Sequence, residues 1–417
     1  MGEEIDMDFL RKATTVSALP RWQLEAIADL SEHLKLKKGA KLIKRGTDDG
    51  FTYFLTAGKV ALEGTGYPPE VVEADTQTTP APLANLRPRI LDVTALGRIQ
   101  VFRVPDLLLK SIESSDGCPV HDGFEEVFKK QEQHRQIQSQ LPFEIYRDLK
   151  RGDSSVLPSL PDTAVRIQLA VEDKISDADS VARLIATDPA IAAKLIMTAN
   201  SAFYGGRTPV ETLTAAVVRL GLKTTCQLVL TFAIKEVFRT RNRALRARMK
   251  ALWEHSAYIA AACFVLSMEV GGTNPEEALL VGLTHDIGSI AIINSADRHP
   301  ELAADPESLE QTIARLRGEL GALILREWRF PPAMIVAARD AEDWGHEHRG
   351  PADATDILIV AQYHDRLRKK QTEGLPRIEE IPAFTKVLGE NASPEKSVAV
   401  INQSEALVDA LRKVLSR

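Results

Sequence analysis

The spacing of hydrophobic residues changes between the first and the second part of this chain. Between residues 39 and 64, short apolar pieces are separated by glycines, a pattern typical of short strands joined by tight turns. The stretch ILDVTALGRIQVFRVP at 90–105 has strand character again, whereas the Pro/Thr-rich segment at 67–89 predicts a loop. A near-helical spacing at 19–30 comes before the strands. We therefore expect a β-rich domain over residues 1–115.

From residue 151 onward the apolar positions recur every three or four residues, which is the period of an amphipathic helix. In LWEHSAYIAAACFVLSMEVGG, for example, His255 and Ile259 fall on one apolar stripe, and two glycines end the segment. This pattern predicts an all-α domain over residues 151–370 and a C-terminal helical extension over 371–417. Residues 116–150 are polar, carry charges of both signs and are expected to form a helical linker.

Composition and charge narrow the class of protein. A chain of 417 residues favours roughly two or three domains. Its 52 basic and 58 acidic residues leave a net charge of −6, which gives no general attraction to DNA or to an anionic membrane. We find no long uncharged apolar run and expect no transmembrane helix. Three widely spaced cysteines favour a reducing compartment, so a cytoplasmic multidomain protein is expected.

The segment GLTHDIGSIAIIN places His285 and Asp286 side by side in an otherwise apolar run. Burying two ionisable groups is costly unless partners occupy them. His255 lies 30 residues earlier, a separation that allows two antiparallel helices with a short connection. Three such ligands could hold a metal ion with open coordination positions. The same residues could instead join helices through hydrogen bonds, and we favour this structural or vestigial use.

The ordered series of motifs in the helical part resembles the HDOD family, a bacterial signalling relative of the HD-domain metal-dependent phosphohydrolases. The series contains LPSLP, DPAIAAKLIMTANSAFYGG, VETLTAAVVRLGLKTT, LWEHS, GLTHDIG and GELGALILREWRFPPAMI. The resemblance implies that the parent enzymes hold metal through a histidine, an adjacent His-Asp pair and a distal aspartate. His255, His285 and Asp286 match the first three of these positions. A metal held there would lower the pKa of bound water and supply a hydroxide that attacks phosphorus.

Other ligand positions that the resemblance implies hold different residues. Arg317 stands where HDOD sequences often have a histidine, and Asp340 and Ala341 stand near the usual paired histidines. Gln362 stands at the place of the distal aspartate. A guanidinium close to a divalent ion opposes metal binding electrostatically. We therefore expect a vestigial metal site with no catalytic residue, no bound metal and no other cofactor.

Residues 15–110 resemble the cyclic-nucleotide-binding β-roll, through LKKGAKLIKRGTDDGFTYFLTAGKVALEG and LRPRILDVTALGRIQVFRVP. That family binds the cyclic phosphate with an arginine, and Arg89 stands at this position. Pro82, Leu83 and Ala84 replace the Phe-Gly-Glu element before it, so the glutamate that binds the ribose is absent. A lone arginine is weak support for a nucleotide site. A protein-interaction or dimerisation module is the interpretation that we favour.

Two further groups of polar residues are expected to be exposed. His346 and His348, in GHEHRG, are expected to face solvent rather than complete a metal site. VFRTRNRALRARMK places Arg239, Arg243, Arg246 and Lys250 on one helical face. This face could meet an anionic ligand or partner, although a solvated helix face is the commoner explanation.

Together these features predict a non-catalytic bacterial signal-transduction protein with a degenerate cyclic-nucleotide-binding-like β-roll and an all-α HDOD domain. It would act by binding signalling proteins, could form a homodimer, and has no helix-turn-helix that would bind DNA. Two alternatives stay open. One is a metal-dependent phosphohydrolase that acts on a nucleotide phosphodiester or monophosphate. The other is a sensor that binds a cyclic nucleotide through Arg89.

Overall fold

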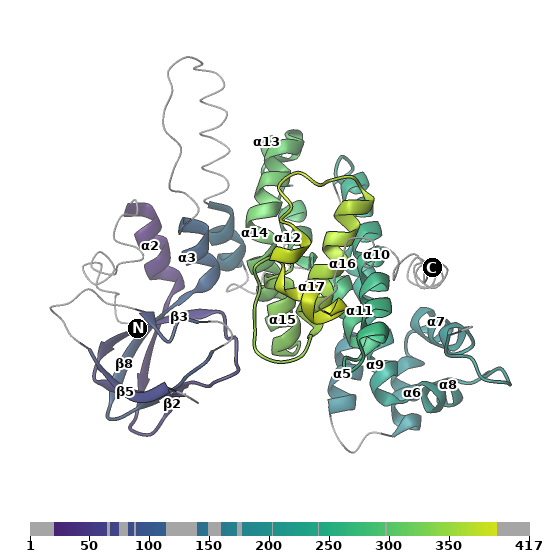
Figure 1. Ribbon diagram of the computed structural model, residues 1–417, viewed down its shortest axis with the longest axis horizontal. Helices are drawn as coiled ribbons and strands as arrows, with labels where there is room; N and C mark the ends of the chain where they lie inside the picture. Colours follow the sequence, from purple (N-terminus) through teal and green to yellow (C-terminus); the bar gives the residue numbers. More distant parts are fainter. Residues whose placement is uncertain are drawn as a thin grey trace, which may run out of the picture.

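The computed structural model describes residues 21–64, 67–74, 82–86, 89–113, 140–148, 160–172, 177–201, 203–240, 242–296 and 298–389. They form an N-terminal β-roll and a larger all-α domain, as the sequence predicted (Figure 1). Of the predicted linker at 116–150, only residues 140–148 are described, and these are helical. The predicted extension at 371–417 is described as far as residue 389. It contains a 3-10 helix, η1 (Ile378–Glu380), and helix α17 (Pro382–Leu388).

The β-roll lies between helix α2 (Arg21–Leu30) and helix α3 (Asp106–Glu113). Its antiparallel strands form two four-stranded sheets, in the orders β1-β8-β3-β6 and β2-β7-β4-β5. The strands are β1 (Glu32–Leu36), β2 (Lys41–Ile43), β3 (Phe51–Ala57), β4 (Lys59–Gly64), β5 (Tyr67–Glu73), β6 (Pro82–Leu83), β7 (Asp92–Ala95) and β8 (Ile99–Pro105). Side chains from both sheets, such as Val60 and Val101, share one fully buried apolar cluster. This cluster forms the core between the two sheets.

The prediction of a loop at 67–89 is wrong in part. Its first residues form strand β5, and Pro82–Leu83 forms β6. β5 pairs with β4 at the edge of its sheet. An edge strand leaves one row of backbone groups unpaired, so prolines, which have no N–H to donate, are tolerated there.

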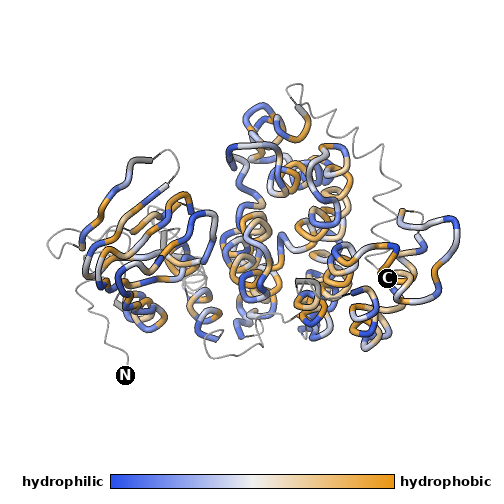
Figure 2. Tube along the Cα trace, turned by 90° about the horizontal axis from the view of Figure 1, so that it is seen from below, coloured by the Kyte–Doolittle hydropathy of each residue, from blue (hydrophilic) through white to orange (hydrophobic). Residues whose placement is uncertain are grey.

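The all-α domain packs its helices around one continuous apolar core. The helices are α5 (Asp162–Glu172), α6 (Ala178–Ile185), α7 (Pro189–Ala199), α8 (Leu213–Leu220), α9 (Leu222–Val237), α10 (Arg246–Val270), α11 (Pro275–Thr284), α12 (Ile287–Ser295), α13 (Pro300–Ala304), α14 (Pro306–Glu327), α15 (Pro332–Arg339), α16 (Ala354–Arg368) and α17. Apolar stretches recur along the helices and the strands (Figure 2). The same core includes apolar residues of α2, α3 and residues 140–148, so the two domains share it.

Two segments are long and apolar enough to cross a membrane by length and composition alone, Arg246–Val270 and Pro275–Ser295. Neither segment is free of charged residues, since the first contains Glu254 and Glu269 and the second contains Asp286. In the structure, 72% and 94% of these apolar windows are buried inside the domain. A helix that is apolar on most of its faces can be covered by neighbouring helices, as these two segments are.

Two glycines let the central helices approach closely. A Cβ atom at Gly282 in α11 would overlap the backbone of Ala260 in α10. A Cβ atom at Gly288 in α12 would overlap the carbonyl oxygen of Arg317 in α14. Only a residue without a side chain fits at either position. This packing brings α11 against α10 and α12 against α14.

Charged side chains also join the two domains. Asp48, in the turn before β3, accepts hydrogen bonds from Arg326 in α14, at 2.8 Å, and from Arg339 in α15. The side chain of Asp48 is fully buried. We call these three residues the interdomain clamp. Lys110 in α3 pairs with Glu319 in α14 at 2.5 Å. A buried carboxylate between two guanidiniums tolerates little displacement, so the clamp fixes how the domains sit together.

Candidate functional site

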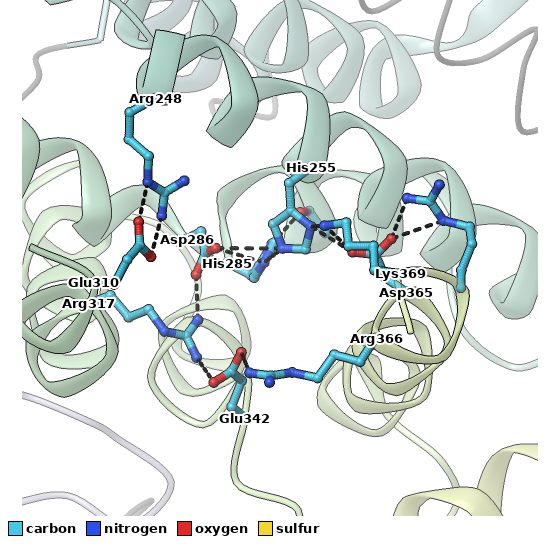
Figure 3. A network of polar contacts seen from close by, with 12 residues as sticks. Arg248, His255, His285, Asp286, Glu310, Arg317, Glu342, Asp365, Arg366 and Lys369 are labelled. Carbon is cyan, nitrogen blue, oxygen red and sulfur yellow. Dashed lines mark hydrogen bonds and ion pairs between the residues drawn. The ribbon is translucent and has the colours of Figure 1, made fainter. Parts of the chain in front are cut away.

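Three candidate site residues meet where α10, α11 and α12 come together (Figure 3). His255 lies in α10, His285 ends α11 and Asp286 begins α12. The Nε2 atoms of the two imidazoles are 3.3 Å apart. Oδ2 of Asp286 lies 3.4 Å from Nε2 of His285 and 3.7 Å from Nε2 of His255. We call this compact cluster the HD centre.

The second nitrogen of each imidazole faces a hydrogen-bond acceptor. Nδ1 of His285 lies 2.7 Å from the carbonyl oxygen of Gly282, and Nδ1 of His255 lies 3.0 Å from Oδ2 of Asp365 in α16. An acceptor at Nδ1 places the proton there, so the lone pair of each neutral ring lies on Nε2. Burial lowers the pKa of His255 although Asp365 opposes this, which favours the neutral ring. Two lone pairs and a carboxylate oxygen therefore converge, an arrangement that suits a cation.

A guanidinium occupies the other side of the HD centre. Arg317 donates from Nη1 to Oδ1 of Asp286 and from Nη2 to Glu342, the latter at 2.5 Å. Arg366 in α16 donates to the second oxygen of Glu342 at 2.8 Å. Burial alone would raise the pKa of Asp286, but His285 and Arg317 outweigh it and hold that pKa well below its usual range. Asp286 is therefore ionised and already paired with a cation.

The remaining candidate positions add no charged ligand to the HD centre. Asp340 follows α15 and pairs with Arg339 at 2.7 Å, and Ala341 is buried without a polar side chain. Gln362 in α16 lines the cleft beside the HD centre, and its Nε2 has no hydrogen-bond partner among the described residues. Gln362 offers an uncharged amide, and the guanidinium of Arg317 pairs with Asp286. The donor set therefore does not fit the metal centre that the sequence resemblance implies. We derive no reaction step through a metal.

Two residues at this site were not predicted from the sequence. Asp365 holds the Nδ1 proton of His255 and pairs with Lys369 at 2.6 Å. Lys369 also lies 3.2 Å from Nδ1 of His255. Burial would raise the pKa of Asp365, but His255 and Lys369 lower it overall. Asp365 lies three residues after Gln362 and therefore on the same face of α16, a spacing that could have identified it.

A cleft of about 960 Å³ opens onto the HD centre. Its basic lining residues are Arg248, Arg317, Arg366, Lys369 and Lys370, and its acidic ones are Asp286, Glu310, Glu342, Asp365 and Glu373. Most of these charges pair with each other, as Arg248 does with Glu310 at 2.6 Å. The cleft therefore has no excess of positive charge to attract a phosphate group.

Arg89 lies inside the β-roll and is 1% exposed. Its guanidinium donates to the carbonyl oxygens of Ala84, at 2.8 Å, and of Phe51, and to Asp49 at 2.9 Å. Tyr53 donates to the same aspartate at 2.9 Å. A cyclic phosphate would have to displace these partners before it could bind Arg89. Ligand binding through this arginine stays a prediction.

The prediction that His346 and His348 face solvent is wrong. Their side chains are 11% and 25% exposed. Nδ1 of His346 lies 3.5 Å from Asp340, and Nε2 of His348 lies 2.7 Å from Asp356 in α16. The segment folds back because Asp353 caps α16 and Asp356 accepts a hydrogen bond from the histidine.

Residues 157–344 match the HDOD domain family. A solved structure from Shewanella amazonensis SB2B, named provisionally as a metal-dependent phosphohydrolase, is 25% identical. It covers 68% of this chain and 99% of its own, with a TM-score of 0.56. A structure from Marinobacter aquaeolei VT8, named provisionally as a signal transduction protein, is 16% identical and covers 96% of this chain and 100% of its own, with a TM-score of 0.49.

An uncharacterized protein of Treponema pallidum (strain Nichols) is 23% identical over 197 residues. The match covers 44% of this chain and 37% of the Treponema protein. The match therefore spans well under half the length of that curated relative.

Proposed function

We propose, from the match of residues 157–344 to the HDOD domain family, that the protein is a non-catalytic signal-transduction protein that acts by binding other proteins. The observation that carries the proposal is the position of Arg317, which bridges Asp286 and Glu342 beside the HD centre. We also propose that the protein is cytoplasmic and that it forms a homodimer.

The charge of Arg317 opposes the chemistry of a hydrolase at this place. A divalent ion at the HD centre would need the carboxylate of Asp286, and Arg317 already neutralises that carboxylate. Glu342, on the far side of Arg317, is shared between Arg317 and Arg366. A second cation would have to enter against the fixed guanidinium, and Coulomb repulsion is strong in a poorly solvated site. These contacts support a structural role for the HD centre.

The interdomain clamp supports a regulatory role. Asp48 belongs to the β-roll, and Arg339 ends α15 in the all-α domain. Glu342, three residues after Arg339, pairs with Arg317. A change in the β-roll that moved Asp48 would therefore act on the short segment that holds Arg317 in place. Direct contacts link Asp48 to Arg339 and Glu342 to Arg317, and we propose that they couple the β-roll to the HD centre.

A groove at the junction of α9 and α10 supports a protein partner with an acidic segment. It measures about 470 Å³. Its charged lining residues are Lys235, Arg239, Arg246, Lys250 and Glu236. Phe238 and Trp253 lie in an edge-to-face pair 5.1 Å apart in the same groove. We call it the basic groove. Arg239 pairs with Glu236, and Lys250 lies 3.6 Å from Glu254. The lining still carries more positive than negative charge, which favours an acidic occupant beside the aromatic pair.

The second candidate function is a metal-dependent phosphohydrolase. It is favoured by the convergence of the His255, His285 and Asp286 donor atoms, which all lie within 4.8 Å of one another. The third candidate, a cyclic-nucleotide sensor, is tested by calorimetry with cyclic AMP and cyclic GMP. A heat of binding that Arg89→Ala abolishes would favour this third candidate over our interpretation of the β-roll.

The proposal is tested by measuring Mn²⁺ affinity in the wild type and in Arg317→His. The substitution removes the guanidinium and adds an imidazole ligand, so we expect Mn²⁺ to bind about 10–100-fold more tightly. His285→Gln in the same background should abolish the gain. Equal affinity in the wild type and in Arg317→His would contradict the role given to Arg317.

A further inference from the structure

A second cluster of metal-ligand residues lies in the connection between α15 and α16. It contains His346, His348 and Asp353, whose donor atoms all lie within 4.8 Å of one another. The two imidazole centroids are 5.6 Å apart. Nε2 of His348 lies 3.4 Å from Oδ2 of Asp353. Such spacings resemble those between ligands of one four-coordinate ion, because metal–nitrogen and metal–oxygen bonds near 2 Å place neighbouring donors roughly 3.3 Å apart.

Asp356 gives an independent indication of a ligand. Its side chain is fully buried, and its Oδ2 lies 2.7 Å from Nε2 of His348 and accepts from the backbone N–H of Asp353 at 3.0 Å. Its second oxygen, Oδ1, is buried and has no hydrogen-bond partner in the described part of the chain. A buried carboxylate oxygen without a partner is costly. A cation in the cluster would satisfy it.

The charges around the cluster also favour a cation. Three carboxylates face it, from Asp340, Asp353 and Asp356. Of the nearby cations, Arg339 is shared between Asp340 and Asp48. Lys386 in α17 donates to the carbonyl oxygen of His348 and lies 3.7 Å from Asp356.

We propose that His346, His348 and Asp353 bind one divalent transition-metal ion of the zinc type, with the buried carboxylate of Asp356 beside them on α16. Two imidazoles and a carboxylate, with a second carboxylate next to them, form a donor set that suits Zn²⁺. The ion would tie the connection after α15 to the first turn of α16, and Lys386 adds a contact from α17. This site uses none of the residues of the HD centre, so the inference does not rest on the proposed function.

The site changes how metal in a purified sample is interpreted. One equivalent of zinc would by itself say nothing about the HD centre, because the two clusters have separate ligands. Variants that remove one set of ligands at a time are needed to assign the ion.

The test is a calorimetric titration of Zn²⁺ into the chelator-treated full chain, with Co²⁺ absorption in the visible range as a report of coordination. His348→Gln removes a ligand. Asp353→Asn removes a charged ligand but keeps a good helix cap, so α16 should stay folded. The matched controls are His285→Gln, in the HD centre, and His33→Gln, on an exposed position of β1. Circular dichroism verifies folding.

We expect the wild type to bind one Zn²⁺ per chain. His348→Gln should weaken the Zn²⁺ affinity at least about 100-fold, and Asp353→Asn should weaken it at least about tenfold. The two control variants should bind Zn²⁺ as the wild type does. Zinc should also raise the melting temperature of the wild type but not of His348→Gln. The proposal is overturned if the chain binds no Zn²⁺, if binding survives His348→Gln, or if His285→Gln removes it.

Discussion

The guanidinium of Arg317 donates to the carboxylate of Asp286, and the two side chains are only 10% and 11% exposed. This pair stands between α14 and the junction of α11 with α12. Asp286, which stands at the position of a metal ligand, is therefore one half of a buried ion pair. Removing one partner of such a pair leaves an uncompensated charge, which costs more than the pair itself contributes.

Arg317→Ala should therefore lower the free energy of unfolding by about 3–5 kcal/mol. The measurement is urea denaturation followed by circular dichroism. Arg248→Ala is the matched control, because Arg248 pairs with Glu310 at the rim of the same cleft with both side chains partly exposed. Its cost should be at most about 1 kcal/mol. Equal costs for the two substitutions would refute the buried role of Arg317.

Asp48→Asn should weaken the contact between the domains. The substitution leaves Arg326 and Arg339 buried without their shared anion, so we expect a loss of about 3–5 kcal/mol and faster amide exchange along α15. Glu73→Gln is the control, because Glu73 pairs with Lys59 on the surface and is 61% exposed. If amide exchange in α15 is unchanged by Asp48→Asn, the clamp does not couple the domains.

Asp340 gives a prediction about acid stability. Burial alone would raise its pKa, but hydrogen bonds from His346 and Arg339 outweigh burial and lower it to about 2. The folded state therefore binds this proton less readily than the unfolded chain. The stabilisation is complete above about pH 4 and is lost as the pH falls through about 2. It amounts to about 2 kcal/mol for a shift from 3.8 to about 2.

Asp340→Asn should flatten the fall in stability between about pH 4 and pH 2, measured by urea unfolding with chelator present. It should also lower the pKa of His346, which Asp340 raises above its ordinary value, in an NMR titration. An acid limb identical to that of the wild type would show that this carboxylate is not paired.

The basic groove should bind an acidic peptide with one aromatic residue. A fluorescein-labelled peptide of Asp and Glu residues around a central Phe is the probe, and fluorescence anisotropy with the full chain is the measurement. The double substitution Arg246→Glu and Lys250→Glu should weaken binding at least about tenfold, because it reverses two cations at the rim. The control is Lys37→Glu with Lys38→Glu, which changes the net charge equally on an exposed turn of the β-roll.

Binding that both double variants weaken equally would indicate general charge attraction rather than the groove. Binding unaffected by replacing the central Phe with Ser would show that the aromatic pair of Phe238 and Trp253 does not take part.

The sequence predicted the order of the two domains and the meeting of His255 with His285, because periodicity and a short separation along the chain determine both. It placed the distal ligand at Gln362 and missed Asp365. The contact of Asp365 with His255 joins residues 110 positions apart and depends on how α16 packs against α10. Local spacing alone carries no information about such packing.

Packing against distant residues also explains why the histidines of GHEHRG and Asp48 are not exposed. A polar loop sequence normally predicts exposure, but Asp356 draws His348 against α16. Asp48 lies in a glycine-rich turn that also suggests exposure. It is buried only because Arg326 and Arg339 approach from positions 278 and 291 residues later.

The central claim, that the HD centre is not a hydrolase site, is tested most directly by hydrolysis of bis(p-nitrophenyl) phosphate by the full chain. The assay contains Mn²⁺, Mg²⁺, Zn²⁺ or Fe²⁺ in turn, and His285→Ala is measured in parallel. We predict no turnover above that of His285→Ala with any of the four metals. Metal-dependent turnover in the wild type that His285→Ala abolishes would contradict the account and establish the phosphohydrolase in its place.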